Sequence, residues 1–228
     1  MKAILVGALC VQIAWQALAP APVARASALP LPPAEPTLRV LALGEPTALA
    51  HGLVLYLQAF DNQPGLSIPY MDLDYAVVEA WLETLLALDP QGHYPLMMAS
   101  HLYGRVPDEA KQRQMLDFVH RAFLRDPDRR WRWLAHAAIV AKHRLKDMPL
   151  ALRYAEEITR NAGDAQGWAR QMRVFILEDM GETEAASVLL GGLLASGEVT
   201  DEAEIRFLAE RLEKLTGVEK SSTPSESR

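Results

Sequence analysis

The fold is decided by residues 126–164, which read DPDRRWRWLAHAAIVAKHRLKDMPLALRYAEEITRNAGD. This stretch contains two runs with helical periodicity, at 130–144 and 148–161. The second run has an apolar stripe opposite its charged side: the stripe is Leu150, Leu152, Tyr154, Ala155 and Ile158, and the charged residues are Arg153, Glu156 and Arg160. A helix with one apolar side packs on that side only. The stretch therefore predicts a pair of helices that packs against neighbouring helices.

An internal repeat extends this pattern over most of the chain. Asp89, Asp126, Asp164 and Asp201 are separated by 37, 38 and 37 residues, and each lies at a break between helical runs. An aromatic or apolar residue opens the helix after each of them: Tyr94, Trp131 with Trp133, Trp168 and Ile205. Repeats of this length are typical of stacked helix pairs. We expect helices over 46–60, 73–88, 94–105, 108–125, 130–144, 148–161, 166–180, 182–196 and 201–215.

Composition and helix-end residues agree with an all-α fold. The chain has 228 residues, of which 50% are hydrophobic and 23% charged, and it has only five Phe. This composition favours helices over a β-sandwich or barrel. Asp74, Asp108 and Asp201 are suited to cap the helices that follow them. The Asp-Pro pairs at 89–90 and 126–127 should end the helices that precede them.

The third and fourth units resemble tetratricopeptide (TPR) repeats. The matching residues are Trp133, Ala137, Leu145, Asp147, Ala151, Tyr154 and Ala155 in the third unit, and Trp168, Met180, Gly181, Glu182, Ala185 and Ala186 in the fourth. The resemblance covers 74–200 and implies a right-handed solenoid of about four helix pairs closed by a C-terminal capping helix. Residues 131–147 and 60–65 also resemble a group of membrane-anchored bacterial TPR-like proteins. Neither resemblance implies an activity.

The N-terminus predicts membrane targeting. Residues 3–19 are apolar except for Gln12 and Gln16, and they follow the positively charged Lys2. Residues 1–19 are therefore a signal-anchor or a cleaved signal peptide; the best cleavage site, before Ser27, lies far from the apolar run, which favours retention. The charge order places the body outside the cytoplasm. We expect a single-pass protein of the bacterial inner membrane with a periplasmic body, or a soluble periplasmic protein after cleavage.

The remaining boundaries follow from composition. Residues 20–40 are rich in Pro and are expected to form an extended linker, which could hold the body about 50 Å from the membrane. Residues 41–216 form the repeat domain, and 217–228 form a Ser-rich, disordered tail. The only cysteine, Cys10, lies in the apolar run, so the chain has no internal disulfide.

Charge is distributed unevenly along the chain. Residues 120–153 carry nine Lys or Arg and three Asp, a net charge of +6, whereas the whole chain has −6 and residues 178–214 have −7. Such a field can attract a charged partner. Alternatively, the two segments neutralise each other within one molecule or between copies.

A basic stripe is the main candidate site. Its members recur at helical spacing and share one face of the predicted helix 130–144 and the residues just after it: Arg132, His136, Ile139, His143 and Lys146. The first helix of each TPR-like pair lines the concave surface, so this face, with His101 one unit earlier and Arg173 one unit later, would form the floor of a positively charged groove. An acidic or extended protein segment or an anionic glycan would fit there. The alternative is a solvated helix face with one or two packed histidines.

The connection at 60–70 is the second candidate. It is longer than a helix pair needs, and long ordered loops often bind partners, which makes Asp61, Asn62 and Gln63 candidates. A purely structural role is the alternative. Gly191 and Gly192 are expected to allow close helix approach.

Several other functions are disfavoured. His136 and His143 are two helical turns apart, about 10 Å, which is too far for one metal ion. The repeat frame places Trp133 in the core and leaves the position of Trp131 open, and the net charge disfavours nucleic acid. The body contains no common catalytic or phosphate-binding motif, so we expect neither an enzyme nor a cofactor.

These observations favour a membrane-tethered, periplasmic scaffold for protein–protein interaction in an envelope assembly. The alternatives are a glycan- or peptidoglycan-binding module and a purely structural accessory subunit of a membrane complex.

Overall fold

The fold is mostly helical, as the sequence predicts. The computed structural model describes residues 2–18, 26–197 and 199–222. The helices are α1 (Lys2–Leu18), α2 (Glu35–Leu41), α3 (Pro46–Gln58), α4 (Tyr75–Leu88), α5 (Tyr94–Met97), α6 (Glu109–Arg125), α7 (Pro127–Val140), α8 (Met148–Asn161), α9 (Gly167–Met180), α10 (Thr183–Ala195) and α11 (Glu202–Ser222). Short elements complete the chain: strands β1 (Asn62–Gln63) and β2 (Leu66–Ser67), 3-10 turns η1 (Tyr70–Asp72) and η3 (Tyr103–Arg105), and π-helical turns η2 (Met98–Leu102) and η4 (Ala141–Leu145).

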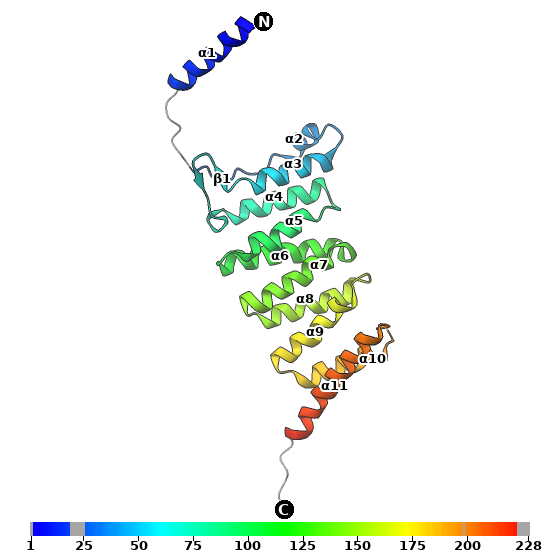
Figure 1. The fold of residues 1–228 in the computed structure, drawn as a ribbon. Coiled ribbons are helices and arrows are strands. Elements are labelled where there is room, and N and C mark those ends of the chain that lie inside the picture. The colour runs from blue at the N-terminus through cyan, green and yellow to red at the C-terminus, as the bar shows by residue number, and fades with distance from the viewer. Residues whose placement is uncertain (1, 19–25, 198, 223–228) are drawn as a thin grey trace, which may run out of the picture.

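The helices from α3 to α11 form a single stack (Figure 1). Each helix packs against the next one along the chain. The elements α5, η2 and η3 together occupy one position in the stack, between α4 and α6. Alternate helices also meet, because α4 contacts α6 and η2 contacts α7. Side chains that bridge alternate helices are 33 to 42 residues apart in sequence. The stack therefore has two long faces: the even-helix face of α4, α6, α8 and α10, and the odd-helix face of α5 with η2, α7 with η4, α9 and α11.

Local chemistry sets the helix ends where the sequence predicts them. The carboxylates of Asp74, Asp108 and Asp201 accept hydrogen bonds from backbone N–H groups in the first turns of α4, α6 and α11, at 2.9, 3.0 and 2.9 Å. These bonds satisfy donors that have no partner inside a helix. The helices α4 and α6 end one residue before the Asp-Pro pairs. The repeating aspartates thus mark the connections from even to odd helices.

Two predicted helices contain irregular turns. The segment at 94–105 changes from α-helix to a π-turn and then a 3-10 turn, and the segment at 130–144 begins earlier, at Pro127, and ends in the π-turn η4. Lys146 follows η4 in a left-handed conformation, with φ of 56°. A π-turn adds a residue to the helical repeat. Lys146 therefore lies beyond the helix and off the regular stripe that the sequence predicts.

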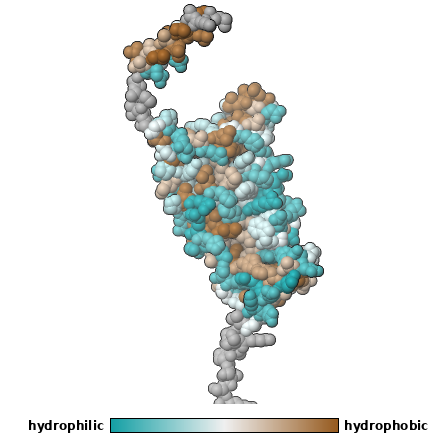
Figure 2. Space-filling view, in the orientation of Figure 1, coloured by the Kyte–Doolittle hydropathy of each residue, from teal (hydrophilic) through white to brown (hydrophobic). Residues whose placement is uncertain are grey.

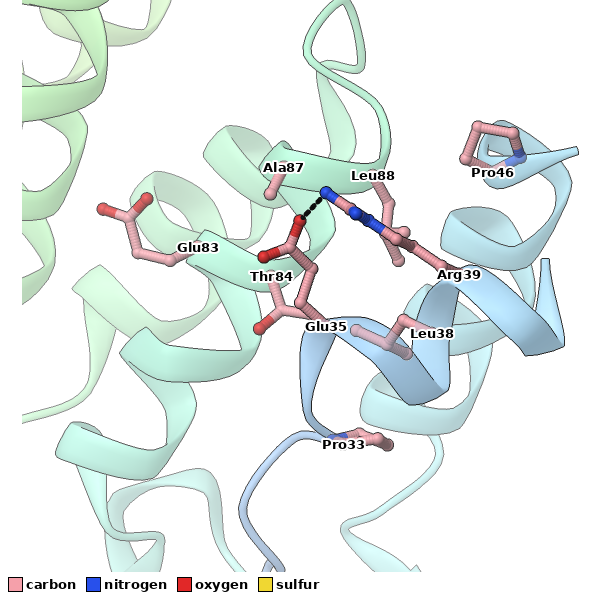
Figure 3. A pocket seen from close by; sticks show the side chains of 9 residues that line it. All are labelled: Pro33, Glu35, Leu38, Arg39, Pro46, Glu83, Thr84, Ala87 and Leu88. Carbon is pink, nitrogen blue, oxygen red and sulfur yellow. Dashed lines mark hydrogen bonds and ion pairs between the residues drawn. The ribbon is translucent and has the colours of Figure 1, made fainter. Parts of the chain in front are cut away.

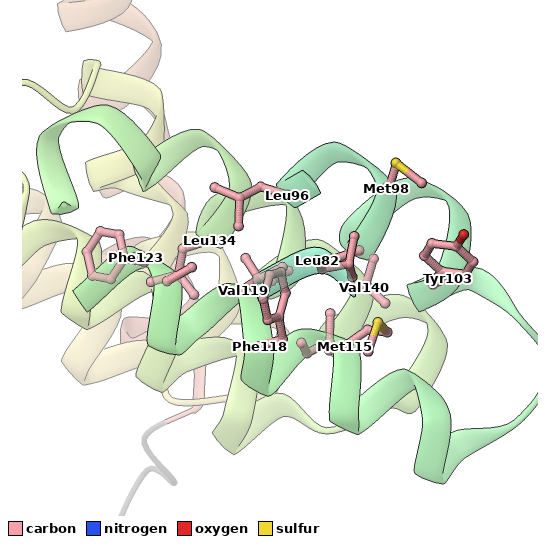
Figure 4. Packing of buried hydrophobic residues seen from close by; sticks show 14 of the residues in the cluster. Leu82, Leu96, Met98, Tyr103, Met115, Phe118, Val119, Phe123, Leu134 and Val140 are labelled. Atoms are coloured by element: carbon pink, nitrogen blue, oxygen red, sulfur yellow. The ribbon is translucent and has the colours of Figure 1, made fainter. Parts of the chain in front are cut away.

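The core runs through the stack between the two faces. Its largest cluster extends from Leu29 to Ile176, and Figure 4 shows the packing of α4 to α7 within it. A smaller cluster joins α9, α10 and α11, in which Leu208 is 1% exposed. Trp131 is buried, at 3% exposure, whereas Trp133 is only partly buried. Trp133 packs against the edge of the main core cluster, and its indole also lies beside the imidazoles of His93 and His101. Trp131, whose position the sequence leaves open, is the more deeply buried of the two.

The Pro-rich segment is packed onto the body over much of its length. The Leu29 side chain is buried, and the indole Nε1 of Trp81 donates to the carbonyl of Pro30 at 2.7 Å. The expectation of an extended spacer is wrong for α2, because Pro36 lies in its first turn, where a backbone N–H is not needed. Residues 19–25 of that predicted linker lie outside the described part of the chain.

The C-terminal helix is longer than expected. The predicted tail begins at residue 217, whereas α11 continues to Ser222. Residues 223–228 of the predicted tail lie outside the described part.

Gly191 and Gly192 in α10 do not mark the close helix approach that the sequence suggests. A Cβ at either position would meet no other atom within 4 Å among the described residues.

Candidate functional site

The odd-helix face presents partly exposed apolar side chains from successive helices. Tyr94 on α5, Ile139 on α7, Trp168 on α9 and Phe207 on α11 are each about half exposed. The rings of Trp131 and Trp168 lie 5.5 Å apart, and those of Phe175 and Phe207 lie 6.5 Å apart, so aromatic contacts connect α7, α9 and α11. Large apolar side chains that remain exposed along one face are typical of binding surfaces. In Figure 2, brown hydrophobic residues also lie among the teal side chains of the stack.

A pocket opens on this face between α7 and α9. Its volume is about 280 Å³. The walls are mainly apolar, and the lining residues are Ala138, Ile139, Lys142, His143, Trp168, Met172, Phe175 and Ile176. The Lys142 ammonium is paired with the Asp179 carboxylate, whereas His143 is exposed. The pocket can therefore take one apolar side chain, with the His143 imidazole available for a polar contact.

The structure brings together two of the predicted groove histidines. The His101 and His136 rings are stacked, with centroids 3.7 Å apart and an angle of 2° between the planes. Burial, followed by the positive charges of His101 and Arg105, lowers the pKa of His136 to about 4. Burial and Arg105 also lower the pKa of His101. Both rings are thus neutral at neutral pH, so they do not contribute positive charge to a groove.

The other predicted residues have different surroundings. The Arg132 guanidinium lies over the Trp131 ring, 5.1 Å from its centroid, and its side chain is exposed. Arg173 on α9 is partly buried, and its Nε has no hydrogen-bond partner among the described residues. Lys146 is in the turn after η4. The exposed groove candidates in the helical segments of this face are therefore Arg132 and His143; His101 is exposed too, but it is one of the two rings of the neutral stack.

Several side chains of the basic segment are already engaged by nearby groups. On the even-helix face, Arg121 pairs with Glu79 and Asp117, and Arg125 pairs with Glu83 at 2.9 Å. The buried Arg130 donates to backbone carbonyls of Ala122 and Pro90 at 2.8 and 2.9 Å. Asp179, which belongs to the C-terminal acidic segment, forms an ion pair with Lys142 of the basic segment. Arg121 and Arg125 are thus paired with acids of α4 and α6, and the distant acidic segment contributes through Asp179.

The second candidate, the connection at 60–70, has a structural role. It forms the hairpin of β1 and β2. The Gln63 side chain accepts from the Ser27 N–H at 2.7 Å and donates to the Ser27 carbonyl at 2.9 Å. The Asn62 amide donates to the adjacent Asp61 carboxylate at 3.1 Å. The Gln63 side chain therefore attaches the N-terminal segment to the body, and both polar atoms of its amide are used in doing so.

A larger pocket, of about 570 Å³, lies between α2 and α4 (Figure 3). Its polar side chains already have partners: Glu35 with Arg39, Glu83 with Arg125, and the Thr84 hydroxyl with the Ala80 carbonyl. A specific small-molecule site needs a few polar groups that converge on the ligand. This pocket offers mainly apolar surface, so we do not assign it a ligand.

Sequence reasoning missed the pocket between α7 and α9. The available signal was the aromatic residue that opens each unit, because Trp168 is one of them. Its position suggested packing between helices, and only the arrangement of α7 against α9 shows that about half of the indole stays exposed. Among the described residues, no group of three or more His, Cys, Asp or Glu is placed to hold a metal ion. Comparison with protein-family models, curated proteins and solved structures gives no match.

Proposed function

We propose that this chain is a membrane-tethered scaffold that binds a partner polypeptide on its odd-helix face. The observation that carries this proposal is the apolar pocket between α7 and α9, continued toward α11 by exposed aromatic rings. The stack of helices supports a right-handed solenoid of TPR-like pairs, in which this face would be concave. The pocket suits an extended segment with one apolar anchor. Arg132 and His143 favour acidic residues beside that anchor.

Membrane attachment is the second part of the proposal. Among the described residues, no single helix is long and apolar enough to cross a membrane by itself, and α1 belongs to the shorter apolar helices. Its side chains from Ile4 to Leu18 are exposed along the whole helix, which favours burial in lipid. With 17 residues it is about 26 Å long, close to the roughly 30 Å of a hydrocarbon core.

The proposed location is the inner membrane, with the body in the periplasm. A phosphatase that is active only after export, fused after Arg228, is therefore expected to be active in cells. An inactive fusion that is present at normal amounts would contradict this orientation. We propose neither a catalytic nor a cofactor-dependent role, and no role for nucleic acid or metal ions.

A pair of matched variants tests the binding face. Ile139→Asp places a carboxylate in the pocket and should weaken partner capture by about 2 kcal/mol or more, roughly 30-fold. Leu124→Asp makes the same change on the even-helix face, at 51% exposure against 41% for Ile139. The full-length proteins are used to capture partners from detergent-solubilised membranes. A polypeptide retained by wild type and Leu124→Asp but lost with Ile139→Asp supports the proposal; equal capture by both variants would contradict it.

The second candidate function is glycan binding, which the half-exposed indole of Trp168 favours because a flat ring can pack against a sugar. Retention of the purified protein on isolated envelope polysaccharide, lost with Ile139→Asp, would support this function in place of the first. An accessory subunit with a purely structural role would show no effect of the variant in either assay.

A further inference from the structure

An exposed aliphatic elbow lies at the N-terminal end of the stack, where α2 turns into α3. Val40 and Leu43 are 73% and 89% exposed, and Leu41 lies between them with more than half of its surface exposed. Leu43 adopts a left-handed conformation with φ of 49°, which is uncommon for a residue with a side chain. In Figure 2, brown side chains gather over α2 at this end of the molecule. The backbone thus holds the Leu43 side chain in water, where it gains almost nothing from packing against the protein.

The elbow has the composition of a membrane segment but not its shape. Together, α2 and α3 are as apolar as a membrane span, yet they are bent by 108°. The helices α2 and α3 cannot span a bilayer in this structure, because one side of each is already packed on the body. The buried residues are Leu38, Ala50, Val54 and Leu57. Only the elbow itself is free to enter lipid. This geometry is that of an interfacial contact, in which apolar side chains enter the lipid surface and the polar flanks stay in water.

The tether between α1 and the body is short. Ser27 and Pro30 are fixed to the body by Gln63 and Trp81. Only residues 19–26 separate the end of α1 from Ser27, and even when fully extended they cover at most about 29 Å. If α1 is in a bilayer, this tether keeps the first layer of the stack near the membrane, within reach of its surface. Figure 1 shows that α2 and α3 form this layer, at the end of the stack opposite to α11.

A second copy of the chain is a poorer occupant for the elbow. A stable protein interface uses about 20–30 residues on each side, whereas the elbow offers a short run of aliphatic side chains. Its nearby charges, Glu35 and Arg39, are paired with each other at 2.6 Å and need no external partner. A lipid surface requires only apolar side chains of suitable reach. The elbow is therefore better matched to lipid than to protein.

We infer that the α2–α3 elbow inserts Val40, Leu41 and Leu43 into the surface of the membrane that holds α1. This inference rests on the proposed membrane tether and adds a second point of attachment. Two points fix the direction of the stack, with α2 and α3 on the bilayer and α11 facing away from it. The odd-helix face then extends outward from the membrane, where a partner can reach it.

Fluorescent labels on the full-length protein test the inference. The protein is reconstituted in vesicles of phosphatidylethanolamine and phosphatidylglycerol, and one environment-sensitive fluorophore is attached at a single cysteine. Native Cys10 reports on α1. In a Cys10→Ser background, Leu43→Cys reports on the elbow and Leu124→Cys is the control, since Leu124 is also exposed but lies on α6.

The label at position 43 should shift to shorter wavelength and be quenched by nitroxide lipids at least about twofold more than the label at position 124, with headgroup-level nitroxides more effective than deep ones. A label at position 43 that stays in a water-like environment would overturn the inference. A blue shift that depends on protein concentration and not on lipid would also overturn it, in favour of pairing between copies. The Cys10 label decides the tether separately, because only α1 insertion gives quenching by deep nitroxides at that position.

Discussion

At the scale of single residues, burial decides what the candidate side chains can do. His101 and His136 lie at positions that suggest a charged groove, but they form a stack in which the pKa of both rings is lowered, mainly by burial. Arg130 lies in the basic segment but is buried and bound to backbone carbonyls. Sequence spacing shows which side chains share a face. It does not show which neighbour covers them.

The His136 pKa predicts acid sensitivity of the fold. In the unfolded chain this imidazole titrates near its ordinary value of 6.5, whereas in the folded protein its pKa is about 4. Between these values the unfolded state binds more protons, so stability is complete above the higher value and falls as the pH decreases toward the lower one. The groups that disfavour the charged ring are His101 and Arg105. Melting temperatures of wild type should therefore decrease from pH 7 to about pH 5.

His136→Phe keeps a planar ring that cannot be protonated, so this variant should lose less of its melting temperature over the same pH range. His143→Phe is the matched control, because it makes the same substitution at an exposed histidine. Identical decreases in wild type and His136→Phe would show that the buried imidazole does not couple protonation to folding.

At the scale of elements, the helix ends were predictable and the irregular turns were not. Asp74, Asp108 and Asp201 set helix starts through hydrogen bonds within three residues, which sequence reveals directly. The π-turns η2 and η4 have no comparable local signal, because they depend on how the odd helices pack on their neighbours. The sequence does not reveal α2 for another reason: the density of prolines around Pro36 predicts an extended chain, although a proline is well suited to the first turn of a helix.

Gly104 tests the packing of the first irregular segment. An added Cβ would lie 2.7 Å from the carbonyl oxygen of Ala99 in η2, and backbone atoms cannot easily move away. Gly104→Ala should therefore destabilise the protein by about 1–3 kcal/mol, as overpacking does elsewhere. Gly191→Ala in α10 is the matched control, because a Cβ there meets nothing within 4 Å.

The control should stabilise the protein by up to about 1 kcal/mol, since alanine is a better helix former than glycine. Chemical denaturation of both variants measures these changes. A neutral or stabilising Gly104→Ala would mean that η2 and η3 are not packed as described.

At the scale of the whole molecule, the repeat organises both fold and surface. The aspartates at intervals of 37, 38 and 37 residues predicted the connections between helix pairs. The same repeat places Tyr94, Ile139, Trp168 and Phe207 on successive odd helices, so exposed apolar side chains follow one face. The candidate surface was only partly predictable: the sequence singles out the helix that becomes α7, but it predicts charge where the structure has a mainly apolar pocket. The difference arises because the rings of His101 and His136 are stacked, with pKa values lowered mainly by burial, and because Lys146 lies beyond the helix.

The central claim is that the odd-helix face contacts a partner polypeptide in the cell. It is tested most directly by site-specific photo-crosslinking of the full-length protein in intact cells. A photoreactive amino acid at Ile139 lies at the pocket between α7 and α9, and the same amino acid at Leu124 lies on the even-helix face. Our account predicts a light-dependent adduct of defined mass with a polypeptide from position 139 and none from position 124. Absence of an adduct from position 139, or equal adducts from both positions in a protein of normal abundance, would contradict it.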